Sequence, residues 1–398
     1  MIAKIEKSQI KGKINAIPSK SYAHRIAICN FLASKEPSGM SGNFTSKDIE
    51  ATERCLKDVN AGKHEVDCGE SGSTLRFLLP LLAARGGEYK FIGHGKLMQR
   101  PNDELFSVLR EHDITIDKQE NIKISGKLTS GDFRLRGDIS SQYVSGLLLA
   151  LPSLTGDSTI TLTTPLSSAA YVDITLEVLR AFGISIDKTS SGYFIRGNQK
   201  FSGDILPEGD WSNAAFFLVA GAIGGEVELT GLNPDSVQGD KAILQVLEQA
   251  GAKLEVNNNS IKVKKSELNG FYMDAEHCPD LVPIVAVLAS VIKGESVIKN
   301  VERLKIKESD RIESTINTLK AFGVKAEYKD NSLVVHGATP VGGIVDSYND
   351  HRIAMAAAVL ASVCDNATVI NGAEAVQKSY PDFFLDFIKL GGRAEYGC

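Results

Sequence analysis

A repeated pattern of about 70 residues constrains the fold of this chain more than any other feature of its sequence. Each copy holds an amphipathic segment that opens with Asp, closes with Gly and leads into alternating apolar and polar residues. Asp caps the free amides of a first helical turn, Gly adopts the left-handed conformation at a helix end, and alternation is typical of a strand. The clearest segments are 173–183, 240–251, 310–323 and 382–392, and weaker ones occupy 48–60 and 103–113.

A second kind of segment alternates with the first. Each begins with polar residues and then becomes apolar on almost every side, which is typical of a helix buried within a core. Each repeat therefore predicts one exposed helix, one buried helix and several short strands. The buried segments are 21–32, 73–84, 140–151, 211–223, 280–292 and 349–363.

The alternation of helices and strands places the chain in the α/β (or α+β) class. Its 398 residues accommodate six copies of the repeat and exceed the size of one ordinary core. A solenoid is the alternative for a repeated sequence, but the inner segments are too uniformly apolar to lie on a solenoid face. We therefore predict two compact domains of three repeats each, with a boundary near the Gly- and Pro-bearing stretch 202–209.

The composition argues against several classes of function. The formal charge is −5, from 44 basic and 49 acidic residues, so bulk charge predicts neither a nucleic-acid nor a membrane partner. The six cysteines include no Cys-x-x-Cys pair, which indicates reduced thiols rather than a zinc site or disulfides. No nucleotide-binding or metalloprotease motif occurs, so we expect no cofactor and no metal. Neither a secretory signal nor a membrane span is recognisable, and we expect a cytoplasmic protein.

The polar starts of the predicted helices carry cationic and hydroxyl side chains. A helix start already attracts anions, because its first amides are free and its dipole is positive there. Each motif also has an ordinary structural explanation, such as an N-cap or an ion-paired surface, and taken alone only the last one favours function. The motifs are 18–25 (PSKSYAHR), 69–76 (GESGSTLR), 140–142 (SSQ), 305–311 (KIKESDR) and 348–353 (YNDHRI), and Arg100, Asp280 and Lys378 stand singly.

Taken together, these residues predict a cleft for small polyanions. If the repeats are pseudo-symmetric, their helix starts point the same way within each domain, and two facing domains line a cleft with cations. Asp280, Glu308 and Asp350 would supply acid–base groups whose pKa values such a cleft tunes. The cations are Lys20, Arg25, Arg100, Lys307, Arg311, Arg352 and Lys378.

These motifs make the chain resemble the enolpyruvyl transferases, and among them the family of 5-enolpyruvylshikimate-3-phosphate synthases. PSKSYAHR, GESGSTLR, QRP, SSQ, KESDR, YNDHR and KSYPDFF occur in the order of that family along the whole chain. The resemblance implies a fold of the inside-out α/β barrel type, with three βαβαββ-like repeats around buried inner helices in each domain. It also implies one domain of residues 18–208, a second of 1–17 with 209–398, and an active site in the cleft between them.

The activity that the resemblance implies is transfer of the enolpyruvyl group of phosphoenolpyruvate to the 5-hydroxyl of shikimate 3-phosphate, in the pathway to chorismate and the aromatic amino acids. We expect these two small molecules as partners and a monomer, because both half-sites lie on one chain. Shikimate 3-phosphate would be held by Lys20, Ser21, Arg25, Ser140, Ser141, Gln142, Ser168, Tyr171, Asp280 and Lys307. Phosphoenolpyruvate would be held by Lys20, Gly72, Arg100, Gln142, Arg311, Arg352 and Lys378.

The family's chemistry is an addition followed by an elimination. Asp280, together with Lys20, would take the proton of the 5-hydroxyl, and Glu308 would help protonate the methylene carbon of phosphoenolpyruvate. The resulting tetrahedral phosphoketal then loses phosphate, without a covalent enzyme intermediate or a metal. Cations around the site would stabilise the developing charge.

The sequence departs from the family pattern at a few positions within these motifs. We expect the departures to change substrate affinity and sensitivity to phosphoenolpyruvate-mimicking inhibitors more than activity. Glu70 matters most, because it adds a carboxylate close to the expected phosphoenolpyruvate site. The positions are Pro18, Glu70, Phe77, Ala169 and Arg303.

Three other functions compete with this interpretation. The related transferase that acts on UDP-N-acetylglucosamine shares the fold, but most members carry a reactive Cys in the loop that corresponds to 93–100, where this chain has none. A non-catalytic polyanion-binding protein would need the cations without Asp280 and Glu308 together. An RNA-end-processing enzyme would favour a basic surface, which the net charge does not indicate.

Overall fold

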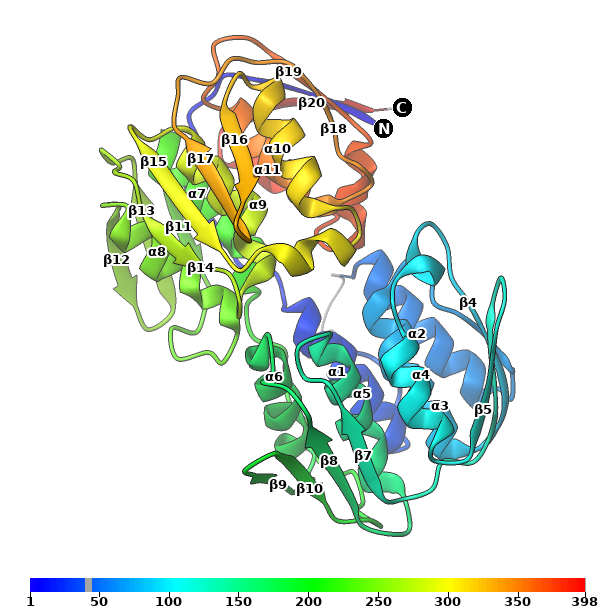
Figure 1. The fold of residues 1–398 in the computed structure, drawn as a ribbon. Helices are drawn as coiled ribbons and strands as arrows, with labels where there is room; N and C mark the ends of the chain where they lie inside the picture. Colours follow the sequence, from blue (N-terminus) through cyan, green and yellow to red (C-terminus); the bar gives the residue numbers. More distant parts are fainter. Residues whose placement is uncertain (40–44, 398) are drawn as a thin grey trace. The chain divides into compact units, whose positions relative to one another are not determined.

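The computed structural model describes residues 1–39 and 45–397 of the chain (Figure 1). The chain divides into two compact units, and each is described by itself. The inserted unit is Pro18–Pro207, and the terminal unit combines Met1–Ile17 with Glu208–Cys398. Cys398 lies outside the described residues, whereas the other five cysteines are buried in the core.

Two copies of a βαβαββ pattern form the sheets of the inserted unit. In each copy the first two strands are parallel and the last two form an antiparallel hairpin, so the sheet order is first, second, fourth, third. One copy is β3 (Glu65–Asp67), α3 (Gly72–Arg85), β4 (Gly87–Ile92), α4 (Asp103–Arg110), β5 (Ile114–Lys118) and β6 (Ile122–Gly126). The other is β7 (Asp132–Leu135), α5 (Ser141–Ala150), β8 (Ser158–Leu162), α6 (Ala169–Ala181), β9 (Ile186–Thr189) and β10 (Gly192–Ile195).

The terminal unit repeats this order, and strands from the start of the chain complete two of its sheets. One copy is β2 (Lys11–Asn15), α7 (Trp211–Gly224), β11 (Glu226–Thr230), α8 (Ile243–Gln249), β12 (Lys253–Asn257) and β13 (Ser260–Lys264). The next is β14 (Tyr272–Asp274), α9 (Val282–Ser290), β15 (Glu295–Lys299), α10 (Arg311–Ala321), β16 (Lys325–Lys329) and β17 (Ser332–His336). The last is β18 (Ile344–Asp346), α11 (His351–Ala361), β19 (Thr368–Asn371), α12 (Phe383–Lys389), β20 (Arg393–Gly397) and β1 (Ile2–Glu6).

The first copy of the repeat differs from the others. It consists of α1 (Lys20–Leu32) and α2 (Lys47–Asn60), which pack against each other. Among the described residues 18–39 and 45–64 no strand accompanies them. The α/β class with repeated βαβαββ units is confirmed, and this copy contributes its helices alone.

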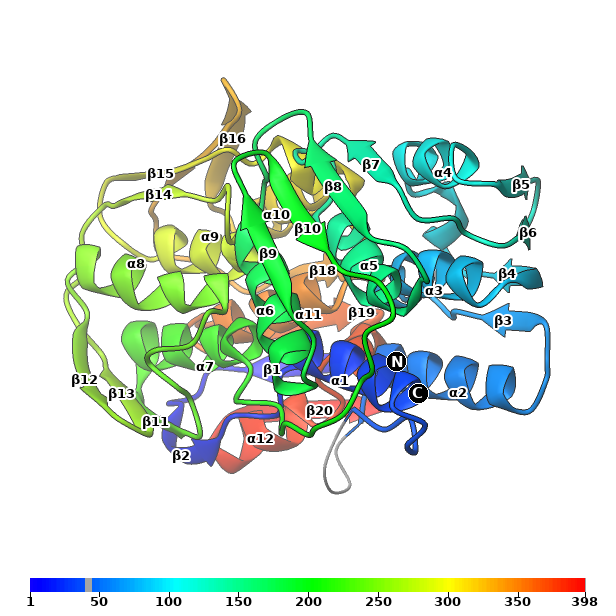
Figure 2. The same ribbon diagram turned by 90° about the horizontal axis from the view of Figure 1, so that it is seen from below.

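The inner helices are buried on all sides, as their uniform apolarity predicts. Every residue of α9 and of α11 is buried, and α7, α9 and α11 pack against one another in the terminal unit. In the inserted unit α3 packs against α5, and the sheet of β3 to β6 lies outside α3 (Figures 1 and 2). Their side chains fill one continuous core that includes Phe77, Tyr143 and Leu147. None of the helices in the described chain combines the length and apolarity needed to cross a membrane.

The amphipathic helices end where the sequence predicts more often than they begin where it predicts. Glycines that follow α6, α8, α10 and α12 have positive φ, from +76° to +89°, as a left-handed helix end requires. At the starts, Asp310 caps α10 by accepting from the amides of Ile312 and Glu313. Asp173 was expected to open its helix, but it lies inside α6, which begins at Ala169. Asp240 lies in a short 3-10 turn before α8 instead of capping it.

Candidate active site

Arg25 organises the predicted binding residues of the inserted unit. Its Nε donates to Thr175 Oγ1 at 2.6 Å, and its other nitrogens donate to the carbonyl oxygens of Ser21 and Tyr171 at 2.6 and 2.8 Å. The starts of α1 and α6 are thereby joined through one guanidinium. Burial lowers the pKa of Arg25 to about 10, so the side chain remains a cation at neutral pH. The ring of Phe77 lies 4.9 Å from its guanidinium carbon, which adds a cation–π contact.

Lys20, at the start of α1, contacts a carboxylate that the sequence did not single out as a site residue. Its Nζ lies 2.8 Å from Oδ2 of Asp48 on α2. Both side chains are less than one fifth exposed, so this pair is better shielded than an ordinary surface ion pair. The sequence pattern had indicated Asp48 only as a helix cap, and its partner on another helix gave no local signal.

Gln142, at the start of α5, is held by side chains of α3. Its Nε2 donates to Ser73 Oγ at 2.9 Å, and its Oε1 accepts from Arg76 at 2.7 Å. Arg76 also donates to Asn102 Oδ1 at 3.0 Å, which fixes the guanidinium from the other side. Because an arginine only donates, Arg76 requires the oxygen end of the Gln142 amide, and the nitrogen end is left to donate to Ser73. Arg76 therefore supports the site although the prediction did not include it.

Gly72 and Arg100 lie directly against each other. A Cβ placed on Gly72 would be 2.6 Å from Nη1 of Arg100, closer than real side chains approach. The absence of a side chain at Gly72 is thus what allows the guanidinium to occupy its position. Glu70 lies two residues earlier and packs against Gly95, where an added Cβ would be 2.7 Å from its Oε2.

The predicted serines occupy the starts of α5 and α6, which pack together. Ser140 caps α5, and its hydroxyl accepts from the amide of Gln142 at 3.3 Å. Ser141 follows it as the first residue of that helix and is buried. Ser168 precedes α6 in a left-handed conformation with φ of +54° and is also buried. The predicted residues of this unit therefore gather at helix starts that direct hydrogen bonds and packing connect.

Asp280 is the centre of a second cluster, in the terminal unit. One carboxylate oxygen lies 2.7 Å from Arg311 and 3.4 Å from Lys307, and the other lies 2.9 Å from Arg352. Burial alone would raise the pKa of Asp280, but Arg352, Lys307 and Arg311 outweigh burial and hold that pKa well below its usual value. The carboxylate is therefore ionised at neutral pH and held in ion pairs with three cations.

Arg311 joins three carboxylates and is almost completely buried. It contacts Asp280, Glu308 at 2.6 Å and Asp350 at 2.7 Å. Burial opposes its charge, yet Asp350, Glu308 and Asp280 together raise its pKa well above the usual value. The opposite balance holds at Lys307, where burial is the largest influence and lowers the pKa despite Asp280.

Asp350 and Lys378 complete this cluster at the start of α11. Asp350 is fully buried, caps α11 through the amide of Arg352 at 3.0 Å, and accepts from Ser309 at 3.1 Å. These donors and Arg311 occupy its oxygens, so Asp350 ties the start of α11 to that of α10, and its acid–base role stays a prediction. Lys378 donates to the carbonyl oxygen of Asn349 at 2.7 Å, immediately beside it.

Asp240 is a second buried carboxyl group near this cluster, and the sequence did not indicate it. Burial and, next, the charge of Asp280 raise the pKa of Asp240 to about 6, while Arg352 opposes the shift. Its Oδ1 has no hydrogen-bond partner among the residues that the structure describes. The sequence treated it as a helix cap, and only its proximity to Asp280 in space distinguishes it.

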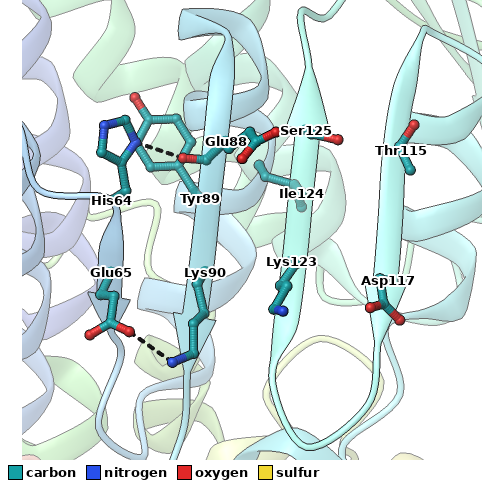
Figure 3. A pocket seen from close by; sticks show the side chains of 10 residues that line it. All are labelled: His64, Glu65, Glu88, Tyr89, Lys90, Thr115, Asp117, Lys123, Ile124 and Ser125. Atoms are coloured by element: carbon teal, nitrogen blue, oxygen red, sulfur yellow. Dashed lines mark hydrogen bonds and ion pairs between the residues drawn. The ribbon is translucent and has the colours of Figure 1, made fainter.

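A separate hollow of 430 Å³ lies on the sheet of β3 to β6, and Figure 3 shows its lining. Its charged groups alternate with buried residues along each strand. Glu65 pairs with Lys90 at 2.7 Å, and Asp117 stands opposite Lys123 in register. No predicted site residue is among its lining residues. Over residues 1–39 and 45–397 no group of His, Cys, Asp and Glu side chains is arranged to hold a metal ion.

Comparison with known families identifies relatives along almost the whole chain. The profile of the family EPSP synthase (3-phosphoshikimate 1-carboxyvinyltransferase) matches residues 57–387. The chain is 43% identical over 416 residues to the 3-phosphoshikimate 1-carboxyvinyltransferase of Clostridium kluyveri, covering 98% of this chain and 97% of that protein. It is 40% identical over 423 residues to the protein of the same name from Clostridium novyi, with the same coverage.

Solved structures with the same fold include enzymes of this chemistry. EPSP synthase from Acinetobacter baumannii superimposes with a TM-score of 0.79 at 23% identity, covering 99% of this chain and all of that one. The enolpyruvyl transferase NikO from Streptomyces tendae gives a TM-score of 0.78 at 17% identity, covering 100% of this chain and 98% of that one. At these identities the likeness establishes the fold, and the close sequence relatives establish the family.

Proposed function

The chain belongs to the EPSP synthase family, and we propose that the clusters around Arg25 and around Asp280 are the two halves of its active site. The protein transfers the enolpyruvyl group of phosphoenolpyruvate to the 5-hydroxyl of shikimate 3-phosphate and releases phosphate. This reaction belongs to the shikimate pathway, which supplies chorismate and the aromatic amino acids. The single observation that carries the proposal about the site is Asp280, a carboxylate kept ionised among three cations.

The first half of the site, on the inserted unit, binds anions. Arg25, Lys20 and Arg100 lie at or beside helix starts, where free amides and the helix dipoles add to their charge. Gln142 and the serines offer uncharged donors and acceptors suited to phosphate and ring hydroxyls. We assign shikimate 3-phosphate to Lys20, Ser21, Arg25, Ser140, Ser141, Gln142, Ser168 and Tyr171, and phosphoenolpyruvate to Lys20, Gly72, Arg100 and Gln142.

The second half of the site, on the terminal unit, supplies both binding and proton transfer. Lys307 and Asp280 would complete the shikimate 3-phosphate site, and Arg311, Arg352 and Lys378 the phosphoenolpyruvate site. Forked guanidinium groups suit carboxylate and phosphate better than ammonium groups do. The reaction would draw on residues of both half-sites, in a site closed to water.

We assign the two proton transfers of the addition step to Asp280 and Glu308. Asp280, assisted by Lys20, takes the proton of the 5-hydroxyl as the oxygen forms a bond to C2 of phosphoenolpyruvate. Glu308 delivers a proton to C3, which gives a tetrahedral phosphoketal. In the second step the C2–O bond to phosphate breaks and a proton leaves C3, which restores the double bond. The surrounding cations stabilise the charge that develops on phosphate and carboxylate.

Phosphoenolpyruvate itself would strengthen Asp280 as a base. Arg311 and Arg352 are the counter-charges that hold the pKa of Asp280 low, and both belong to the proposed phosphoenolpyruvate site. When the substrate's anionic groups share these guanidiniums, Asp280 loses part of its stabilisation and its pKa rises toward that of the proton it must accept. Asp280 is therefore a stronger base when phosphoenolpyruvate is bound than when it is absent.

The test is phosphate release from phosphoenolpyruvate with two acceptors in separate reactions. Phosphate should be released when shikimate 3-phosphate is the acceptor and not when UDP-N-acetylglucosamine is. Phosphate release with UDP-N-acetylglucosamine and not with shikimate 3-phosphate would show the same chemistry with a different acceptor. Binding of phosphoenolpyruvate without release in either reaction would contradict a catalytic role for Asp280 and Glu308.

A further inference from the structure

A buried chain of hydrogen bonds links three helix starts of the inserted unit, and the proposed reaction does not use it. His24 Nδ1 lies 2.8 Å from Thr52 Oγ1, and Thr52 Oγ1 lies 2.6 Å from Thr74 Oγ1. Thr74 Oγ1 lies 2.7 Å from Ser71 Oγ, and the amide of Thr74 donates to the same Ser71 oxygen at 3.2 Å. All four side chains are buried, with exposed fractions of at most 1%.

The chain runs parallel to the contact between Lys20 and Asp48. Lys20 and His24 are four residues apart on α1, so they lie on the same face of that helix. Their partners Asp48 and Thr52 are likewise four residues apart on α2. The two helices are therefore joined by two successive rungs, Lys20 with Asp48 and His24 with Thr52. Thr74 extends the second rung to α3, whose first residue is Gly72.

His24 is a neutral imidazole in this position. Burial is the largest influence on its pKa, and the nearby charges of Lys20 and Arg25 act in the same direction, so the pKa lies well below its usual value. The charged groups close to it are thus two cations, with Asp48 paired to one of them. Its other neighbour is Phe77, whose ring lies edge-on with centroids 6.4 Å apart.

The neutral ring fixes the direction of the chain. An imidazole without charge has one N–H and one lone pair, and Nε2 of His24 has no hydrogen-bond partner among the described residues. The N–H therefore belongs on Nδ1, where it can donate to Thr52, because a buried N–H without an acceptor is costly. Thr52 can then donate to Thr74 and Thr74 to Ser71, and the carbonyl oxygen of Asp48, 3.4 Å from both threonine hydroxyls, is a longer and weaker acceptor for each. The single proton of Ser71 is left to donate outside the chain.

We propose that His24, Thr52 and Thr74 are positioning residues that hold the start of α3, from Ser71 to Ser73, in register with Lys20. This role rests on the proposed function, in which Lys20 and Gly72 bind phosphoenolpyruvate. Ser71 caps α3 and immediately precedes Gly72, so a shift of Ser71 displaces the backbone that Arg100 packs against. Because small displacements of a binding backbone weaken substrate contacts strongly, the chain sets affinity rather than bond making.

The first experiment compares Thr52→Val, which keeps the shape and removes the hydroxyl, with Thr52→Ser, which keeps the hydroxyl. Thr52→Val should raise the KM for phosphoenolpyruvate by about tenfold, the effect of one or two lost hydrogen bonds. Its kcat should fall by less than about threefold, and Thr52→Ser should stay within about twofold of the parent in both constants. Equal KM values for parent and Thr52→Val would overturn the proposal.

Thr368→Val is the matched control. Thr368 is fully buried in β19 of the terminal unit, and its hydroxyl has no hydrogen-bond partner among the described residues. This variant makes the same chemical change and should leave both KM values unchanged. If it raises the KM for phosphoenolpyruvate as much as Thr52→Val does, a general loss of packing explains both, and the positioning role is wrong.

The second experiment needs no turnover, and its main readout comes from the unmodified protein, so it does not depend on a variant that folds. Nitrogen-15 NMR of the labelled chain distinguishes a protonated Nδ1 from a protonated Nε2 and from an imidazolium. His24 should be neutral at neutral pH with its proton on Nδ1, and Thr52→Val should change that resonance. A proton on Nε2, or an imidazolium, would contradict the proposed direction. If the parent shows this tautomer but no transfer to shikimate 3-phosphate, the proposed function fails while the hydrogen-bond chain stands.

Discussion

The clusters around Arg25 and Arg311 use arginine in opposite ways. Arg25, in the inserted unit, gives its hydrogen bonds to hydroxyls and backbone carbonyls, so its positive charge is not cancelled by them. Arg311, in the terminal unit, contacts three carboxylates. The first arrangement leaves charge available to bind an anion. In the second arrangement, an anion must compete with Asp280, Glu308 and Asp350 for Arg311.

Replacing Asp280 should have the largest effect, because it removes the proposed base and keeps the cations. We expect Asp280→Asn to lower kcat by about a thousandfold, within the range of general acid–base catalysis. Phosphoenolpyruvate should bind the variant at least as tightly as the parent, because a competing carboxylate is gone. Single-turnover phosphate release and direct binding measure the two effects. A fall in kcat of less than tenfold would assign the base to another group.

Replacing the two arginines compares the clusters directly. Arg311→Met should cost about 3–5 kcal/mol of folding free energy, because it leaves buried carboxylates without their counter-charge. Arg25→Met leaves neutral acceptors and should cost about 1–3 kcal/mol. Urea denaturation of the two variants measures the difference. If Arg25→Met were the more destabilised variant, the distinction between the two clusters would not hold.

Asp240 tests the electrostatics of the second cluster through pH. Its pKa of about 6 in the folded state is above the ordinary value of 3.8, so the folded protein binds the proton more tightly than the unfolded chain. The contribution of Asp240 to the free energy of unfolding is therefore complete below pH 3.8 and is lost as the pH rises to about 6. Asp240→Asn should gain stability relative to the parent over this range, by about 3 kcal/mol at neutral pH.

The control for this prediction carries the opposite sign. Asp365 is exposed, and its hydrogen bond to Lys7 lowers its pKa, so its contribution is lost as the pH falls. Asp365→Asn should therefore lose a little stability relative to the parent as the pH rises, and the loss should weaken in high salt. If the stability of both variants relative to the parent changed with pH in the same direction, the pKa of Asp240 would not be raised in the folded protein.

Replacing Gly72 should have the smallest of these effects and should be confined to the first half of the site. In Gly72→Ala the new Cβ forces Arg100 to move, because the two would otherwise be 2.6 Å apart. We expect the KM for phosphoenolpyruvate to rise about tenfold, as for the loss of one charge-assisted hydrogen bond. The KM for shikimate 3-phosphate should change by less than twofold. Steady-state kinetics with each substrate varied in turn distinguishes the two constants.

The sequence predicted the repeats and the buried helices because both depend on local periodicity. It also indicated the residues that cluster around Asp280, because their motifs can be read in the sequence and occur in the order typical of a known family. The sequence did not predict Asp48, Arg76 and Asp240 as site residues, because the groups they interact with belong to other parts of the fold. A carboxylate near a helix start is ordinarily a cap, and nothing in the neighbouring residues distinguishes a cap from the partner of Lys20.

The helix starts were the least predictable local feature. Asp173 precedes an apolar pattern that ends at Gly183, which is a usual signature of a cap. The helix begins earlier, at Ala169, because Ser168 adopts a left-handed conformation that turns the chain into α6. The lack of strands at residues 18–39 and 45–64 of the first repeat was equally hard to predict, since helices with the expected pattern occur there.

The strand β1 makes folding of the terminal unit depend on residues that lie far apart in the chain. It pairs with β20 in register from Ile2 opposite Gly397 to Glu6 opposite Arg393, so β1 must wait until β20 has been synthesised. The inserted unit has no such dependence and can fold as soon as Pro207 has left the ribosome. The terminal unit completes this sheet only when β20 is available, through contacts of very large sequence separation, which is typical of slow folding. Loss of β20 would thus leave β1 as an exposed edge strand prone to aggregation.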